Sequence, residues 1–305
     1  MSAFLTSLET QIRKHNLNLF SAGEMLSDGI PHVQYYTENN PCQDVYSVAK
    51  AFTVTAVGLL VDRGLLSVDE TITNVLIDEL PENCESIWYS TTLDMLLRHQ
   101  VALPAGFLDI DCEDASTWGD DYLKYTLTYP IQPAAEPVYC YTDAAFYLLS
   151  RAVESRAGMP LDNFLWKELF LPFKCREAAW SHCPQGHAMG ATGLYIRTED
   201  MLKLGRLYLD DGTWQGQRLL SKEWVDTVRS RGYELNPVGV GSSFGKGGMR
   251  GQMLLIIPET DRVAAWQGYV TKNPWNPTRW AASYRDADSA SECCPAEMKQ
   301  KGSSL

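Results

Sequence analysis

The chain has 305 residues, of which 45% are hydrophobic and 21% charged, and its formal net charge is −12. These values are ordinary for a globular protein with room for one large domain or two interleaved ones. The basic residues form no cluster in any segment, which argues against nucleic acid as a partner. No stretch approaches the roughly 18 apolar residues of a membrane span, so no membrane association is expected.

The first segment predicts a helix, two strands and a second helix. Residues 3–15 have apolar positions at helical spacing. Residues 17–21 and 33–37 are strand-like around a turn at 28–31. A polar loop at 38–46 then leads to an apolar helix that starts at Ser47 and ends near Arg63 and Gly64.

The middle of the chain, from about 75 to 190, has a mostly helical pattern with long loops. Helices are expected at 92–99, capped by Thr91 or Thr92, at 144–154 and at 161–170. Beyond it, Thr198 and Ser221 are predicted as caps of two further helices.

The last third predicts a β-hairpin, with strands at 253–258 and 262–269 joined by residues 259–261. Residues 284–305 form a polar tail that contains Cys293 and Cys294. The outline predicts an α/β (α+β) fold in which an antiparallel sheet is built from both ends of the chain. Its sheet domain comprises 1–75 and 190–283, and its helical subdomain 76–189.

Ser47 and Lys50 form a Ser-x-x-Lys pattern at the start of the first apolar helix. A spacing of three places both side chains on one helix face, near the positive end of the helix dipole. A lysine among Ala, Phe and Val is expected to have its pKa lowered by desolvation, and could then accept the serine proton. The pattern alone is weak, because many matches are a helix cap followed by a solvated lysine.

Tyr141 and Asp143 precede the helix at 144–154. A tyrosine beside a lysine ammonium can be drawn toward phenolate and act as a general base. Asp143 could cap the helix. Packing by Tyr139 and Tyr141, with Asp143 only as a cap, is the simpler alternative.

A third segment, Lys246, Gly247, Gly248, Met249 and Arg250, leads into the hairpin. A backbone N–H here could join that of Ser47 as an oxyanion hole, and Lys246 or Arg250 could attract a substrate carboxylate. The alternative is a glycine-rich turn with exposed cations.

Other motifs do not support chemistry. Gly241–Gly245 matches Gly-x-Ser-x-Gly, but no helix and no histidine follow it. His182, Cys183 and His187 lack further ligands at suitable spacing, so neither a metal nor another cofactor is expected. His99, at the end of an apolar helix, is interpreted as structural.

The order of the three segments resembles the serine β-lactamase and penicillin-binding protein superfamily. Its pattern is Ser-x-x-Lys opening a helix, Tyr-x-Asn before a second helix, and Lys/His-Thr-Gly at a strand. The stretches at 92–99, 193–201 and 251–258 are also similar to those of class C β-lactamases, family VIII esterases and 6-aminohexanoate-dimer hydrolase. The similarity extends over roughly residues 20 to 270.

The resemblance implies that Ser47 is the nucleophile, Lys50 its activator and Tyr141 the base and later proton donor. It implies an oxyanion hole from the N–H of Ser47 and one near Met249. Two motifs depart from the family. Asp143 replaces the Asn of Tyr-x-Asn, and the third motif is either Lys246-Gly247-Gly248 or Gly248-Met249-Arg250.

These departures, and an N-terminus without the pattern of an export signal, favour a cytoplasmic esterase or amidase over a β-lactamase or DD-peptidase. Such a serine hydrolase would act on a small ester or amide through an acyl-enzyme. Two alternatives remain open. One is a catalytically silent binding protein with the same fold, and the other is an acyltransferase in which an alcohol or amine replaces water. The oligomeric state is left open.

Overall fold

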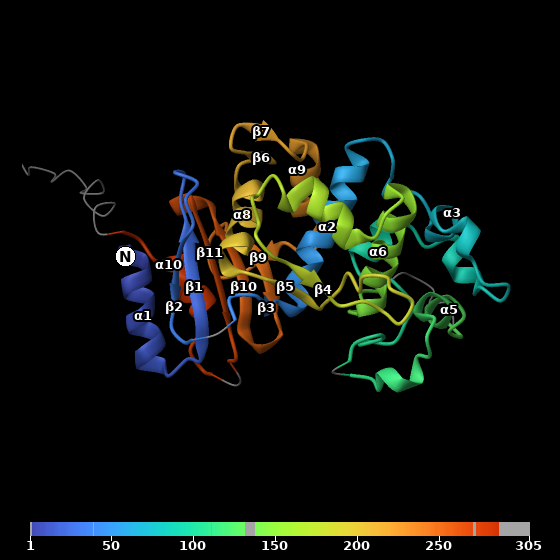
Figure 1. Cartoon of the computed structure of the whole chain (residues 1–305), viewed down its shortest axis with the longest axis horizontal. Coiled ribbons are helices and arrows are strands. Elements are labelled where there is room, and N and C mark those ends of the chain that lie inside the picture. Colours follow the sequence, from blue (N-terminus) through green and yellow to red (C-terminus); the bar gives the residue numbers. More distant parts are fainter. Residues whose placement is uncertain (1, 39, 111, 132–137, 271–272, 287–305) are drawn as a thin grey trace, which may run out of the picture.

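The computed structural model describes residues 2–38, 40–110, 112–131, 138–270 and 273–286 (Figure 1). Cys293, Cys294 and most of the predicted tail lie outside the described residues. A sheet flanked by helices occupies one side of the molecule and a mostly helical region occupies the other (Figure 1). Across the described ranges, no helix combines the length and apolarity needed to span a bilayer.

The main sheet of the described chain has six antiparallel strands in the spatial order β2-β1-β11-β10-β9-β8. The strands are β1 (Leu19–Met25), β2 (His32–Tyr35), β8 (Asn236–Pro237), β9 (Phe244–Gly248), β10 (Gln252–Ile257) and β11 (Arg262–Gly268). The predicted hairpin is the β10–β11 pair. Because β1 lies between β2 and β11, strands from both ends of the chain form one sheet, as predicted.

Helices cover both faces of the sheet. Helices α1 (Ala3–His15) and α10 (Pro277–Ser283) pack on one face, and α8 (Thr198–Leu209) packs on the other. Strand β10 divides its side chains between these two cores, since successive residues of a strand point to opposite faces. Met253, Leu255 and Ile257 join α1 and α10, and Leu254 and Ile256 join the core that includes α8.

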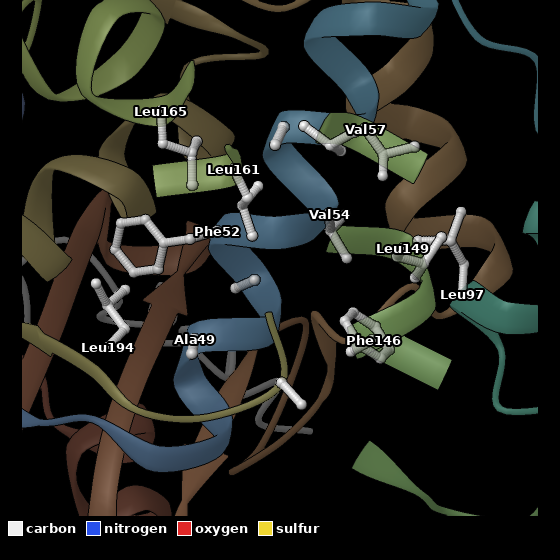
Figure 2. Packing of buried hydrophobic residues seen from close by; sticks show 14 of the residues in the cluster. Ala49, Phe52, Val54, Val57, Leu97, Phe146, Leu149, Leu161, Leu165 and Leu194 are labelled. Carbon is white, nitrogen blue, oxygen red and sulfur yellow. The ribbon is translucent and has the colours of Figure 1, made fainter. Parts of the chain in front are cut away.

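Helix α2 (Ala49–Val61) is the centre of the larger core. It is buried from Ala49 to Leu60, as expected for a helix that is apolar on all sides. Figure 2 shows side chains of α4 (Leu93–Leu97), α6 (Asp143–Ala157) and α7 (Leu161–Leu165) around it. The residues at its first turn are therefore held by a rigid, enclosed element.

The remaining elements are short. They are α3 (Ile72–Val75), α5 (Tyr122–Leu127), α9 (Lys222–Arg231), β3 (Gln43–Asp44), β4 (Ala179–Trp180), β5 (Leu194–Ile196), β6 (Thr213–Trp214) and β7 (Gln217–Arg218). The helix predicted at 161–170 is α7 followed by a π-helical turn, Trp166–Phe170. The boundaries proposed for the two domains stay a prediction.

The predicted caps have different outcomes. Thr92 and Ser221 cap α4 and α9, because each hydroxyl accepts from a backbone N–H of the first turn. The prediction for Thr198 is wrong, since Arg197 is the N-cap of α8. The Thr198 hydroxyl bonds instead to Ser21 Oγ at 2.6 Å and Gln267 Oε1 at 3.0 Å, partners supplied by distant strands.

Candidate active site

Ser47 lies in a 3-10 turn, Tyr46–Val48, that leads directly into α2. The turn begins with Tyr46 in the left-handed backbone region, at φ 47°, and its N–H donates to Asp44 Oδ1 at 2.8 Å. This conformation is uncommon for a bulky residue, and such residues cluster at functional sites. Ser47 itself is half-buried, so its hydroxyl is presented at the edge of the core.

Lys50 is fully buried and its ammonium nitrogen faces three acceptors. Nζ donates to Asp143 Oδ1 at 2.7 Å, to the Ala191 carbonyl oxygen at 3.0 Å and to Ser47 Oγ at 3.3 Å. A lysine ammonium has three N–H donors and no acceptor. The surroundings therefore match the charged form of Lys50.

The pKa of Lys50 follows from the same contacts. Burial disfavours the ammonium, but the carboxylate of Asp143, with further contributions from Tyr141 and Glu234, outweighs burial and raises the pKa. The expectation of a pKa lowered by desolvation is wrong, because the compensating carboxylate comes from a helix 93 residues away. Lys50 is therefore an ammonium that donates to Ser47, and its nitrogen has no free electron pair for the serine proton.

Tyr141 supplies the other partner of the serine. Its hydroxyl oxygen lies 2.7 Å from Ser47 Oγ. Lys50 Nζ is 4.8 Å from the centre of the Tyr141 ring and Lys246 Nζ is 5.2 Å from it. Two positive charges therefore lie beside the ring of Tyr141, whose hydroxyl is within hydrogen-bonding distance of Ser47.

Asp143 is the first residue of α6 and is buried. The expectation that it caps this helix is wrong, since the Thr142 side chain accepts from the Ala144 N–H and Thr142 is the N-cap. The Asp143 carboxylate is turned toward Lys50, where the ammonium offers a stronger, charge-assisted hydrogen bond.

Lys246, Gly247 and Gly248 form the end of β9, and Met249–Gly251 is the turn into β10. The alternative of a glycine-rich turn with exposed cations is wrong for Lys246, Gly247 and Gly248, which are in a strand, and a turn is found only at Met249–Gly251. A Cβ at residue 248 would collide with the carbonyl oxygen of Val45. Glycine therefore allows β9 to approach the turn that carries Ser47.

The cations of this segment have partners of their own. Lys246 forms an ion pair with Glu234. Arg250, at φ 60°, places its guanidinium 4.7 Å from the centre of the Tyr269 ring. Met249, which lies between Lys246 and Arg250 in the sequence, is the first residue of the turn and is 39% exposed. The structure thus brings Lys246 to Tyr141 and holds Arg250 against Tyr269.

A hollow of about 470 Å³ adjoins the same segment. Gly247, Trp266 and Trp275 contribute to its lining. Gly247 and Lys246 face opposite sides of β9, because positions along a strand alternate. The hollow therefore lies on the sheet face covered by α1 and α10, away from Tyr141.

His99 and Glu234 belong to the site although neither was predicted there. Both are buried, and His99 Nε2 lies 2.5 Å from Glu234 Oε1. Burial alone raises the pKa of Glu234, but Lys246 and the hydrogen bond from His99 outweigh it and lower the pKa from 4.5 to about 2. The position of His99 at the end of the helix predicted at 92–99 was the available signal. For Glu234, no pattern in the sequence indicates a place in the site.

The motifs set aside in the sequence have structural roles. Ser243 Oγ donates to the Val238 carbonyl oxygen at 2.7 Å, within its own loop. His182 pairs with Asp162 at 3.1 Å and His187 with Glu154 at 2.8 Å. Over the residues that the structure covers, no group of three or more His, Cys, Asp or Glu is placed to hold a metal ion.

Comparison with known proteins identifies relatives at low identity. The chain is 24% identical over 257 residues to the 6-aminohexanoate-dimer hydrolase of Paenarthrobacter ureafaciens, covering 71% of this chain and 63% of that protein. The chain thus spans less than two thirds of the length of this relative.

Solved structures that share the fold include the following two. A Bacillus anthracis protein provisionally assigned as a 6-aminohexanoate-dimer hydrolase superposes with a TM-score of 0.72 at 16% identity, over 90% of this chain and 79% of that one. A class C β-lactamase of Rhodobacter sphaeroides superposes with a TM-score of 0.64 at 18% identity, over 93% of this chain and 98% of that one. These likenesses confirm the predicted antiparallel sheet flanked by helices.

The family described as Beta-lactamase matches residues 36–291, a range that includes Ser47, Tyr141 and Lys246. This match confirms the resemblance inferred from the order of the three segments. The chain belongs to the Beta-lactamase family.

Proposed function

We propose that the chain is a serine hydrolase that cleaves a small ester or amide through an acyl-enzyme on Ser47. One observation carries the proposal: Ser47 Oγ lies 2.7 Å from the Tyr141 hydroxyl and 3.3 Å from Lys50 Nζ. A serine becomes a nucleophile when a base is within hydrogen-bonding reach and a further group orients that base. In this proposal Tyr141 is the base, and Lys50, which donates to Ser47 Oγ and lies beside the Tyr141 ring, is the group that orients both.

The first half of the reaction acylates Ser47. The Tyr141 phenolate takes the Ser47 proton while Oγ forms a bond to the substrate carbonyl carbon, whose oxygen takes up the electron pair. When the tetrahedral intermediate collapses, the bond to the leaving alcohol or amine breaks. Tyr141 returns its proton to that group and is again a phenolate.

The second half releases the acyl group. A water molecule gives a proton to Tyr141 and attacks the acyl carbon. The bond to Ser47 Oγ then breaks, and Oγ recovers a proton from Tyr141. Lys50 stays an ammonium throughout and donates to Ser47 Oγ. An alcohol or amine in place of water would make the same acyl-enzyme an acyltransferase.

The proposed oxyanion donors are the backbone N–H groups of Ser47 and Met249. The close approach of Gly248 to Val45 supports this pairing, because it brings the turn that begins at Met249 beside the turn that carries Ser47. Fixed N–H donors of this kind stabilise the charge that develops on the carbonyl oxygen.

The charges of the site favour a substrate without a carboxylate next to the scissile bond. Lys50 is paired with Asp143 and Lys246 with Glu234, so a substrate carboxylate gains little from either cation. The name of the Paenarthrobacter ureafaciens relative, a 6-aminohexanoate-dimer hydrolase, supports a small amide as one candidate substrate.

Intact-mass analysis after exposure to a fluorophosphonate and to a penicillin tests the proposal. A fluorophosphonate adduct that disappears in Ser47→Ala is expected, with little or no penicillin adduct. No Ser47-dependent adduct from either electrophile would favour a silent binding protein. Product analysis with a chromogenic ester, with and without added alcohol, then separates hydrolysis from acyl transfer.

A further inference from the structure

We propose that His99 and Glu234 are positioning residues that fix Tyr141 and Lys246 relative to Ser47. The proposal rests on the function proposed above. Neither residue is required to touch the substrate. Their role is to hold the base and one of its two flanking cations in place.

His99 holds the chain on both sides of Tyr141. Its carbonyl oxygen accepts from the Cys140 N–H at 2.8 Å, and its Nδ1 accepts from the Thr142 N–H at 3.4 Å. The imidazole ring also lies against the Tyr141 ring, with 4.6 Å between the ring centres. One residue therefore restrains both neighbours of Tyr141 and the plane of its ring.

The same contacts assign the tautomer of His99. Because Nδ1 accepts a backbone N–H, the ring proton is on Nε2 and is donated to Glu234 Oε1. Glu234 is then a carboxylate, and its Oε2 accepts from Lys246. Lys246 in turn lies beside the Tyr141 ring, so the contacts form a closed circuit from Tyr141 through His99, Glu234 and Lys246 and back to Tyr141.

Both positioning residues have left-handed backbones. His99 has φ 53° and Glu234 has φ 65°. His99 follows α4 at the position where helices favour glycine, and the Gln100 N–H closes the helix by donating to the Met95 carbonyl oxygen. A glycine would satisfy that turn at lower strain, but it could not bind Thr142 or Glu234 through a side chain.

The charges around Tyr141 set the direction of the test. The titratable groups about its ring and hydroxyl are Lys50 of α2, Asp143 of α6, His99 after α4, Glu234 after α9, Lys246 of β9 and the exposed Tyr139. Removing the negative charge of Glu234 leaves Lys246 uncompensated and strengthens the positive field at the Tyr141 ring. Removing the positive charge of Lys246 does the opposite.

The test measures the rate of Ser47 labelling by a fluorophosphonate from about pH 5 to about pH 10, a range that spans the ordinary pKa values of His and Tyr. In Glu234→Gln, the pH of half-maximal rate should fall by about one unit or more. In Lys246→Gln it should rise by a similar amount. The opposite shifts keep the test valid if one of the two variants does not fold.

His99→Asn tests positioning separately. Asn tolerates the left-handed backbone, and its amide oxygen can still accept from Thr142, but the contacts with Glu234 and the Tyr141 ring are lost. The labelling rate at the optimum should fall by about 10- to 100-fold. Glu154→Gln, which breaks the remote His187–Glu154 pair, is the matched control and should leave both rate and pH profile unchanged.

The outcomes separate this proposal from the proposed function. If the wild-type chain is not labelled at Ser47, the function itself fails. If it is labelled, and folded Glu234→Gln, Lys246→Gln and His99→Asn match its rate and pH profile, the positioning role alone is overturned. The positioning role is also overturned if the labelling rate falls only in proportion to the fraction of unfolded protein and the pH profile does not shift. That result is expected if His99 and Glu234 contribute only to stability.

Discussion

Two lysines flank Tyr141, and their surroundings differ. Lys50 belongs to α2 and is fully buried against α6. It donates to three hydrogen-bond acceptors and is paired with Asp143. Lys246 comes from the sheet, keeps 12% of its side chain exposed and is paired with Glu234. Lys50 donates to the proposed nucleophile directly, whereas Lys246 approaches the site beside the Tyr141 ring.

The difference assigns separate tasks to two similar ion pairs. The Lys50–Asp143 pair lies in the core and also belongs to the proposed mechanism, because its ammonium reaches Ser47. The Lys246–Glu234 pair links the sheet to the helical region that carries Tyr141. The link runs from Glu234 to His99, whose ring lies against Tyr141. Breaking the first should therefore affect stability and labelling together, and altering the second should mainly change how the site depends on pH.

The largest effect is expected for Lys50→Ala. It leaves the Asp143 carboxylate buried without a counter-charge, which should lower the free energy of unfolding by about 3–5 kcal/mol and nearly abolish Ser47 labelling. Urea unfolding followed by tryptophan fluorescence measures the first quantity. The double variant Lys50→Met/Asp143→Leu should regain stability but not labelling. A Lys50→Ala protein that is folded and quickly labelled contradicts the role of Lys50.

Tyr141→Phe comes next. Removing the hydroxyl of this proposed base should slow labelling by about 10²- to 10⁴-fold. The free energy of unfolding should change by less than about 1 kcal/mol, because the half-buried ring is retained. Tyr139→Phe is the control, since Tyr139 is 64% exposed and should keep the wild-type rate. Equal rates for the two variants would count against Tyr141 as the base.

The Lys246–Glu234 pair predicts an acid-dependent stability. The folded-state pKa of Glu234 is about 2, below its ordinary 4.5, so its contribution to stability is fully present above 4.5 and is lost as pH falls toward 2. The loss should be about 3 kcal/mol. Thermal unfolding of wild-type and Glu234→Gln proteins across this range checks it, with a shallower acid dependence expected for the variant. Parallel curves would show that Glu234 does not titrate in this way.

The smallest effect concerns substrate charge. Since both lysines are paired, p-nitrophenyl butyrate should be hydrolysed with a kcat/KM about tenfold above that of the p-nitrophenyl monoester of succinate, a difference of about 1.4 kcal/mol. Glu234→Gln leaves Lys246 with uncompensated charge and should narrow the difference. Preference of the wild-type protein for the anionic ester would refute this account of the site.

The parts of the site that follow local rules could be predicted from the sequence. The spacing of Ser47 and Lys50 fixes their approach whatever surrounds them, and the apolar pattern of α2 indicates a core helix. The hairpin at 252–268 likewise follows from neighbouring residues. The order of the three segments then pointed to the family, which the comparison confirms.

What the sequence did not reveal depends on partners far along the chain. Asp143 is the main partner that keeps Lys50 charged, and the Thr198 hydroxyl binds Ser21 and Gln267 instead of capping α8. His99 and Glu234 join the site through left-handed turns after two different helices. Spacing rules for helices and strands carry no information on such contacts.

The contact between Gly248 and Val45 has a consequence for synthesis of the chain. The turn with Ser47 leaves the ribosome early, but β9 emerges only after the helical region is complete. Strand β1 is also synthesised early, but it cannot pair along the edge that faces β11 until β11 has been synthesised. The nascent chain thus carries Ser47, the proposed nucleophile, for most of translation without the turn that supplies the second proposed oxyanion donor. If the proposal holds, labelling of Ser47 requires that the two ends of the polypeptide have come together.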